Sequence, residues 1–366
     1  MNELRDLLPG IKDWNYFNYA AAGPLLKPSS DLLKERAEQN LSPPSLYRES
    51  WLRQIEETRA TCAEFIGAAP EEIAFVTNTG AGLNLVANAI HWKAGDRILF
   101  PEDEFPTNRI VWENLAVKGV SPEAIPVDSK RSFADQLAAM DLTRVRLIAV
   151  SAISYCDGRA HELGKISQLC KKINAYFSID AIQALGTMEF DLRKTPCDFL
   201  STASRKWLFG PLGAGFLYIK RSRLPELFVS NAGWMSVKNE AKAQWEFIDG
   251  AKRFESGLLY PPAIHAMGKS IQTLKAFGWP RIFQRIEKLH SHLKHELQAM
   301  GHTPYRPDAK HGILVLKMDD KAGPFATKCA EHKLLLTERK GLVRISLHAT
   351  TLDKEIELLL QLLKKN

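Results

Sequence analysis

The sequence predicts an α/β protein, with a large three-layer domain built on a mostly parallel sheet and a smaller α+β domain after it. In residues 71–218, short apolar runs alternate with helix-like stretches, which is typical of parallel strands joined by helices. After about residue 256 the pattern changes to long helices around two strand-like runs. The length of 366 residues exceeds what one hydrophobic core usually fills, so two domains are expected.

The large domain is expected to contain strands at five apolar runs, residues 73–76, 97–100, 147–150, 176–179 and 215–219. Polar motifs follow these runs or the strand-like residues 198–203, namely 77–82, 104–108, Ser154, Asp180 and 204–206. Ligands of parallel sheets bind beyond the carboxyl ends of the strands, so we expect these motifs to meet at one edge.

The smaller domain is expected to hold helices at 263–277 and 282–300, strands at 312–316 and 342–346, and a closing helix from Leu352. We assign residues 16–255 to the large domain. Residues 256–366, together with the N-terminal segment 1–15, are assigned to the smaller one.

The composition is that of an ordinary soluble globular protein, with 45% hydrophobic and 25% charged residues. No apolar run approaches membrane-spanning length and the first residues are charged, so we expect a cytoplasmic protein with no membrane partner. The net charge of +7 is spread along the chain, which does not favour nucleic acid as a partner. The five cysteines are scattered and form no CxxC pair, so free thiols are expected rather than disulfides or a metal site.

Lys206 lies between a strand-like approach and the glycine-rich residues 210–215. An amine forms an imine with an aldehyde only when it is partly unprotonated, and burial beside a second cation, here Arg205, favours that state. Asp180 ends the apolar run 177–180, and pyridoxal 5'-phosphate (PLP) needs an anion against its ring nitrogen. Together these segments suggest a PLP enzyme.

Three further motifs fit such a site, and each also has an ordinary structural explanation. Residues 77–82 precede a predicted helix whose first amides could bind a phosphate, although a simple helix cap explains them equally well. Phe105 could lie over the cofactor ring or belong to the core. Arg344 could form a bidentate hydrogen-bonded pair with a substrate carboxylate, or an ordinary surface ion pair.

These motifs, in this order, resemble the class V aminotransferase family of fold-type I PLP-dependent enzymes. That family includes cysteine desulfurases, kynureninase and isopenicillin-N-epimerase-like proteins. The likeness runs from residues 16–24 to 344–348 and is most specific at 180–183 and 204–211. It implies Lys206 and Asp180 as catalytic residues, and it implies a set of cofactor-binding residues: Thr79, Gly80, Phe105, Ser154, Asp180, Gln183, Ser204, Arg205 and Lys206.

The resemblance also implies a role for each residue. Lys206 would hold PLP covalently, Asp180 would pair with the ring nitrogen, and Gln183 would hydrogen-bond the phenolic oxygen, near which Ser154 would also lie. The phosphate would be held by Thr79, Gly80 and Ser204, with Arg205 nearby. The substrate residues would be Arg344, Asn18 and Ala21.

The chain departs from the family pattern at three positions. Phe105 stands where many members stack a histidine on the ring, which removes one acid/base group. Leu258 stands where members often have a threonine that reaches the partner subunit's phosphate, so that contact is left open. Cys329 precedes Arg344 as a desulfurase's persulfide-forming cysteine does, but residues 326–332 predict a helix, in which a buried thiol is inert.

We therefore expect a homodimeric PLP enzyme that acts at the α-carbon of a small amino acid, with Lys206 as the general base. Aminotransferase activity is the main expectation, because the lysine alone can complete it. The alternative is a lyase of the desulfurase or kynureninase kind, or an epimerase. Two rivals from other classes are a cofactor-binding module without catalysis and a nucleotide-binding enzyme that uses residues 77–82. The sequence does not name the substrate.

Overall fold

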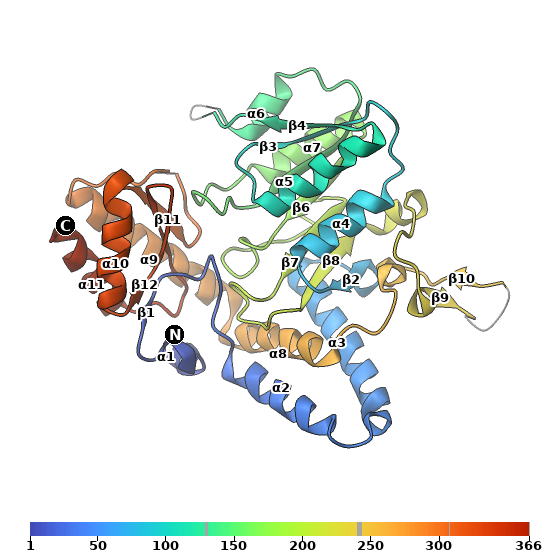
Figure 1. Cartoon of the computed structure of the whole chain (residues 1–366), viewed down its shortest axis with the longest axis horizontal. Helices are drawn as coiled ribbons and strands as arrows, with labels where there is room; N and C mark the ends of the chain where they lie inside the picture. The colour runs from blue at the N-terminus through green and yellow to red at the C-terminus, as the bar shows by residue number, and fades with distance from the viewer. Residues whose placement is uncertain (129–130, 240–243, 307, 366) are drawn as a thin grey trace.

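A seven-stranded sheet forms the centre of the larger part of the molecule (Figure 1). The computed structural model describes residues 1–128, 131–239, 244–306 and 308–365. The strand order is β2-β8-β7-β6-β5-β3-β4, and every neighbouring pair is parallel except those made by β8. The strands are β2 Ile73–Val76, β3 Arg97–Pro101, β4 Ser121–Ile125, β5 Val145–Ser151, β6 Tyr176–Asp180, β7 Phe199–Ala203 and β8 Gly215–Ile219.

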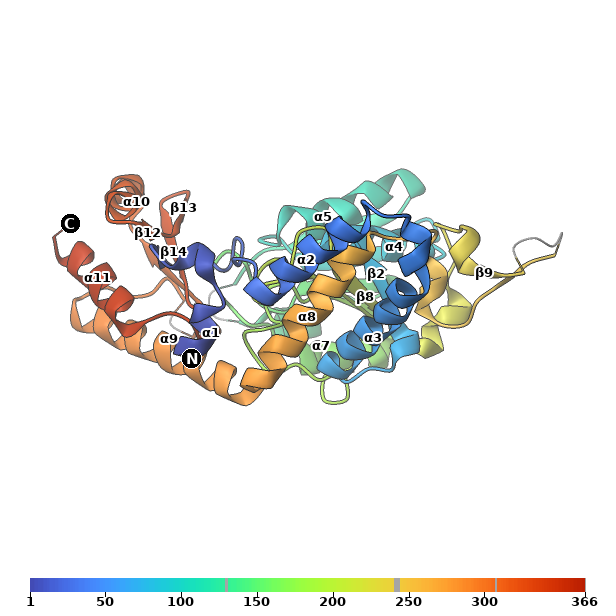
Figure 2. The ribbon, with the colours of Figure 1, turned by 90° about the horizontal axis from the view of Figure 1, so that it is seen from below.

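Helices cover both faces of this sheet, which makes the three layers that the sequence predicts. The alternation along β5 shows this, because Ile148 and Val150 enter one hydrophobic core while Leu147 and Ala149 enter the other. One face is covered by α3 (Arg48–Ile66), α7 (Leu163–Ile173) and α8 (Pro261–Phe277), and the other by α4 (Thr79–Ala89) and α5 (Pro106–Glu113). Helix α2 (Lys27–Gln39) lies outside, along α8 (Figure 2). Short α6 (Phe133–Ala138) contacts α7.

The smaller part has its own core around an antiparallel sheet with the order β11-β14-β13. The strands are β11 Ile313–Lys317, β13 Thr337–Arg339 and β14 Leu342–Ser346. The core is completed by α9 (Trp279–Ala299), α10 (Ala322–Glu331) and α11 (Asp353–Lys364). Figure 1 shows this part to the left of the large sheet.

The N-terminal residues join the two parts. Helix α1 (Asn2–Asp6) carries Arg5, which forms an ion pair of 2.8 Å with the buried Glu355 of α11. Strand β1 (Asn15–Tyr16) then pairs with β12 (Leu334–Leu335) of the smaller part. From there the chain runs past Lys206, where the amide of Gly23 donates to the Arg205 carbonyl.

A two-stranded hairpin, β9 (Val237–Lys238) with β10 (Glu246–Phe247), projects from the far side of the large part (Figures 1 and 2). Its neighbourhood exposes the large apolar side chains of Trp234, Trp245, Leu258 and Tyr260. Among the described residues, no helix combines the length and the apolarity that crossing a membrane requires.

Candidate active site

Lys206 lies on a loop that is held by a hydrogen bond of its own, by the segment around Gly23 and by helix α8. The loop follows β7, and the amide of Gly210 returns to the Ser204 carbonyl at 2.9 Å. Gly23 approaches so closely that a Cβ there would lie 2.0 Å from the Lys206 carbonyl oxygen, so only glycine fits. From α8, the Ser270 hydroxyl donates to the Phe209 carbonyl at 3.0 Å. Phe209 has a positive φ of 54°, a left-handed conformation that this packing stabilises.

Lys206 and Asp180 are both buried, and the charge of each affects the pKa of the other. Burial lowers the pKa of the Lys206 amine; Asp180 opposes that shift, and the positive charges of Arg205 and Arg344 reinforce it. Burial likewise raises the pKa of Asp180, against the hydrogen bond from the Ile182 amide at 2.9 Å and the attraction of Lys206. A lysine with a lowered pKa can act as a nucleophile towards an aldehyde and as a proton acceptor near neutral pH.

Phe105 lies beside this pair. The Lys206 Nζ is 5.8 Å from the centre of the Phe105 ring, and that ring meets Tyr155 edge-on at 5.1 Å. Phe105 caps the N-terminus of α5, where Pro106 begins the helix and points the ring into the pocket. An aromatic ring here can support a flat heterocycle above Asp180.

The start of α4 forms the third side of the pocket. Asn78 caps the helix by accepting from the Ala81 amide at 2.9 Å. The amides of Thr79 and Gly80, at the first positions of the helix, have no acceptor within the helix. A Cβ on Gly80 would meet the Thr107 methyl at 2.8 Å, so glycine permits the contact with α5. The Thr79 hydroxyl oxygen is buried and has no hydrogen-bond partner among the described residues.

These residues line one cavity of about 200 Å³: Asn78, Thr79, Gly80, Phe105, Thr107, Asp180, Ile182, Ala203, Arg205 and Lys206. The cavity therefore joins a helix N-terminus with an unsatisfied hydroxyl, an aromatic face, a buried carboxylate and a buried amine. That donor set fits PLP, because the phosphate, ring, ring nitrogen and aldehyde of PLP each find the group they require.

The residues expected to bind the substrate come from the smaller part and the N-terminal loop. Arg344 on β14 donates to the Tyr155 carbonyl at 2.8 Å and to the Thr337 hydroxyl at 3.5 Å. The Thr337 hydroxyl in turn donates to the Asn18 side chain at 2.5 Å. Ala21 is tied to the cofactor side, since its carbonyl accepts from Arg205 at 2.9 Å. Asn18 and Arg344 are thus linked through Thr337, and Ala21 is linked through Arg205 to the cavity, although none of the three is among the residues that line it.

Three of the expected cofactor residues have their polar groups engaged elsewhere. The side-chain carbonyl of Gln183 accepts from the Trp207 indole at 2.7 Å, and the side-chain amide donates to the Ala20 backbone carbonyl at 3.1 Å. The Ser204 hydroxyl donates to the backbone carbonyls of Pro211 and Ala214, and the Ser154 hydroxyl accepts from the Cys156 amide. In this structure Gln183, Ser204 and Ser154 therefore shape the loops around the cavity rather than lining it.

Glu104 is a buried carboxylate whose importance the sequence did not reveal. It accepts from both the amide and the hydroxyl of Ser151, each at 2.5 Å. Ser151 is paired in register with Asp180, so Glu104 lies one strand away from the carboxylate of the site. Burial raises the pKa of Glu104 to about 7, against the two hydrogen bonds from Ser151. The only sequence signal was its position at a strand end, directly before Phe105.

The cysteines lie away from the cavity or are electrostatically unsuited to react. Cys329 is fully buried on α10 within the core of the smaller part, where burial raises the pKa of its thiol to about 11. This confirms the predicted helix at that position. Cys156 lies near Arg344, yet burial and the carboxylates of Asp157 and Asp103 raise the pKa of its thiol. A thiol that stays protonated is a poor nucleophile.

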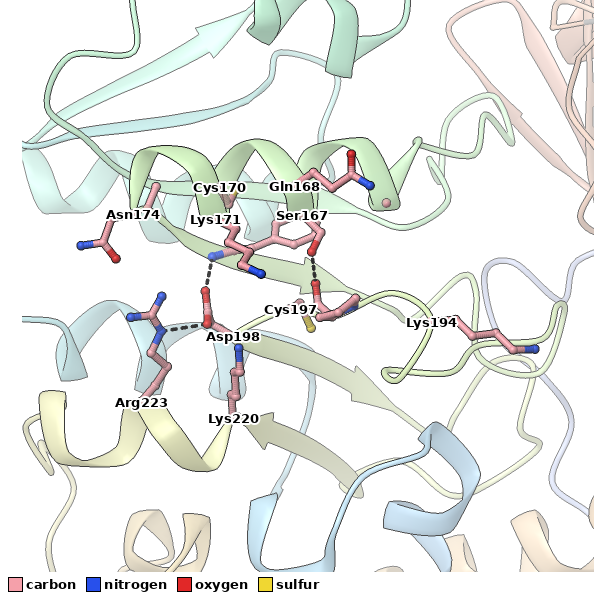
Figure 3. A pocket seen from close by; sticks show the side chains of 14 residues that line it. Ser167, Gln168, Cys170, Lys171, Asn174, Lys194, Cys197, Asp198, Lys220 and Arg223 are labelled. Atoms are coloured by element: carbon pink, nitrogen blue, oxygen red, sulfur yellow. Dashed lines mark hydrogen bonds and ion pairs between the residues drawn. The ribbon is translucent and has the colours of Figure 1, made fainter.

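A second cavity, of about 450 Å³, lies at the opposite ends of the strands (Figure 3). Its central carboxylate, Asp198, is already satisfied by Arg223 at 2.8 Å and by the Phe177 amide at 3.0 Å. Its lining contains neither Lys206 nor Phe105, which line the smaller cavity. Its polar groups stabilise the junction of β6 and β7.

Comparison with known proteins gives one consistent picture. The family model of aminotransferase class-V matches residues 33–359. A probable cysteine desulfurase of Methanothermobacter thermautotrophicus is 26% identical, over 98% of this chain and 96% of its own length. A cysteine desulfurase of Pectobacterium carotovorum is 30% identical, over 72% of this chain and 67% of its own.

Among solved structures, the cystine C–S lyase C-DES has been determined with its reaction product cysteine persulfide. It has a TM-score of 0.91 and 23% identity, and the match covers 97% of this chain and 98% of that one. A variant of C-DES with glycine linked to its PLP cofactor gives a TM-score of 0.92 and 22% identity, over 98% of each chain. These scores show that the chain has the same fold.

Proposed function

Because the chain belongs to the class V aminotransferase family of PLP-dependent enzymes, we propose that it is a lyase that cleaves the carbon–sulfur bond of cysteine-type amino acids. The relatives named above are desulfurases, so they favour the lyase alternative over the amino-group transfer expected first from the sequence. The C–S lyase C-DES, which shares the fold, points in the same direction.

In this proposal, some residues of the site bind the cofactor or the substrate, and Lys206 also transfers the proton. PLP supplies an electron sink for the charge released at the α-carbon of the substrate. Lys206 would hold the cofactor, and its freed amine would take the α-proton, since burial keeps that amine partly unprotonated. Arg344 would bind the substrate carboxylate and so orient the α-hydrogen towards Lys206. Asp180 would hold the ring nitrogen, and Phe105 the ring plane.

The position of the cysteines is the observation that carries the choice of β-elimination. A desulfurase passes sulfur to a thiolate of its own, but Cys329 is buried on a helix, and burial with two nearby carboxylates raises the pKa of the Cys156 thiol, which disfavours its thiolate. In β-elimination the sulfur leaves on the departing group, and no protein thiol is needed. L-Cysteine and water would then give pyruvate, ammonia and sulfide, whereas L-cystine would give pyruvate, ammonia and cysteine persulfide.

A product assay tests this proposal. The PLP-loaded enzyme is incubated with L-cysteine and with L-cystine, and pyruvate, ammonia, sulfide and alanine are measured. The proposal expects pyruvate and ammonia in equal amounts. Alanine as the main product would instead indicate a desulfurase, and the sulfur-containing keto acid of the substrate (3-mercaptopyruvate from L-cysteine) without ammonia would indicate transamination.

We also propose a cytoplasmic homodimer. The large apolar side chains of Trp234, Trp245, Leu258 and Tyr260 are exposed in this subunit, and side chains of this kind are ones that a partner subunit can cover. Five free cysteines suit a reducing compartment. Sedimentation of the loaded enzyme tests the assembly, and a monomer at micromolar concentration would contradict it.

A further inference from the structure

A second arginine, Arg339, lies on the same face of a hairpin as Arg344. Strands β13 and β14 form a hairpin in which Thr337 pairs with Arg344 and Arg339 pairs with Leu342. Side chains two residues apart on a strand share a face, so Arg339 lies on the same face as Thr337 and Arg344. The two guanidinium groups are close enough that the charge of Arg339 contributes to lowering the pKa of Arg344, after burial, to about 10.

Tyr155 connects this pair to the reacting end of the cavity. Its ring lies edge-on against Phe105 at 5.1 Å, and the Arg339 guanidinium lies 5.4 Å from the centre of the same ring. Its carbonyl accepts from Arg344. The contacts therefore run from Lys206 to Phe105, then to Tyr155, and from Tyr155 to both Arg339 and Arg344.

The positive charge of this pair is not compensated by the protein. Within the described ranges, neither Arg339 nor Arg344 forms an ion pair, and the buried Nε of Arg344 has no hydrogen-bond partner. Asp103 and Asp157, which act on Cys156 together with both arginines, are already paired, since Asp103 pairs with Arg159 at 2.5 Å and Asp157 pairs with Arg306 at 2.9 Å. Two unpaired cations at one mouth favour a ligand with two negative groups.

We propose that the enzyme prefers amino acids whose side chain ends in a second anion, with Arg344 on the α-carboxylate and Arg339 on the distal group. This inference rests on the proposed function and narrows its substrate class. L-Cystine, which carries a second carboxylate, belongs to that class, and so do cysteine S-conjugates that end in a carboxylate. Arg339 is a specificity residue because it does not touch the reacting atoms.

The test uses two probes of the same shape that differ in one charge, S-carboxymethyl-L-cysteine and S-carbamoylmethyl-L-cysteine. Binding to the PLP-loaded enzyme is followed by the change in cofactor absorbance, for the wild type, Arg339→Gln and Lys340→Gln. Lys340 is the matched control, since it is an exposed cation next in the chain. The wild type should bind the carboxymethyl probe about fivefold more tightly, the scale of an exposed ion pair. Lys340→Gln should keep this preference and Arg339→Gln should lose it.

Two results would overturn the proposal. One is a wild type that binds both probes equally. The other is an Arg339→Gln variant that weakens both probes by the same factor, because Arg339 would then serve the α-carboxylate alone. Product analysis on the same samples separates this inference from the proposed function: keto acid without ammonia would reject the lyase even if the charge preference stands. Pyruvate with ammonia from both probes at equal affinity would keep the lyase and reject the role of Arg339.

Discussion

Replacing Glu104 by glutamine should make the protein more stable at and above neutral pH. The side chain is buried against Ser151, one strand from Asp180, and burial raises its pKa from the ordinary 4.5 to about 7. The folded protein therefore binds a proton at Glu104 more tightly than the unfolded chain does. The contribution of this proton to the unfolding free energy is complete below pH 4.5 and is lost as the pH rises through 7. The difference between these two pKa values corresponds to about 3 kcal/mol of unfolding free energy, since each tenfold change in proton affinity is about 1.4 kcal/mol.

Glutamine can replace both hydrogen bonds, because its carbonyl accepts from the Ser151 amide and its amino group donates to the hydroxyl. The variant should therefore match the wild type near pH 5 and exceed it by up to about 3 kcal/mol at pH 8. Urea unfolding of the cofactor-free protein between pH 5 and 8 measures this, with Glu113→Gln, an exposed carboxylate paired with Arg109, as the control. A stability difference that does not change over this pH range would refute the reasoning.

Three further predictions follow from the ion pairs and thiols. Glu255→Ala removes the buried partner of Arg59 at 2.6 Å and leaves it only the half-exposed Glu56 at 3.0 Å, so the unfolding free energy should fall by about 3–5 kcal/mol. A loss below about 1 kcal/mol in urea unfolding would contradict a buried pair. Arg344→Ala should weaken amino-acid binding by about 2–5 kcal/mol in an absorbance titration while the cofactor band is unchanged, and unaltered affinity would remove this residue from the site. Cys329→Ala and Cys156→Ala should each keep carbon–sulfur cleavage at nearly the wild-type rate. If either variant folds but forms no pyruvate, elimination without a protein thiol is wrong.

The sequence predicted the large sheet well because its central strands are buried on both faces and appear as continuous apolar runs. The edge strand β4 was missed, since Ser121–Ile125 is half exposed and contains proline. The antiparallel direction of β8 was also not predictable, because Gly215–Ile219 has the same apolar pattern in either direction. Strand direction follows from how the Lys206 loop returns to the sheet.

The lining of the cavity was predictable where a residue follows a strand end or begins a helix, as at Asp180 and Thr79. It was less predictable where function depends on which partner a side chain finds. Gln183, for example, bonds to Trp207, and only the folded loop brings these two together. The place of Arg339 beside Arg344 was not predictable for a related reason, because it comes from the register of a hairpin. Such a pairing leaves no periodic signal in the sequence.

The absorbance of the purified protein tests the central claim most directly, namely that Lys206 holds PLP covalently above Asp180. The wild type with added PLP should show a band at roughly 420 nm, and borohydride should fix the cofactor to the peptide that contains Lys206. Lys206→Ala should bind PLP without this covalent link. A wild type that stays colourless with PLP, or a variant that keeps the reducible link, would contradict the account.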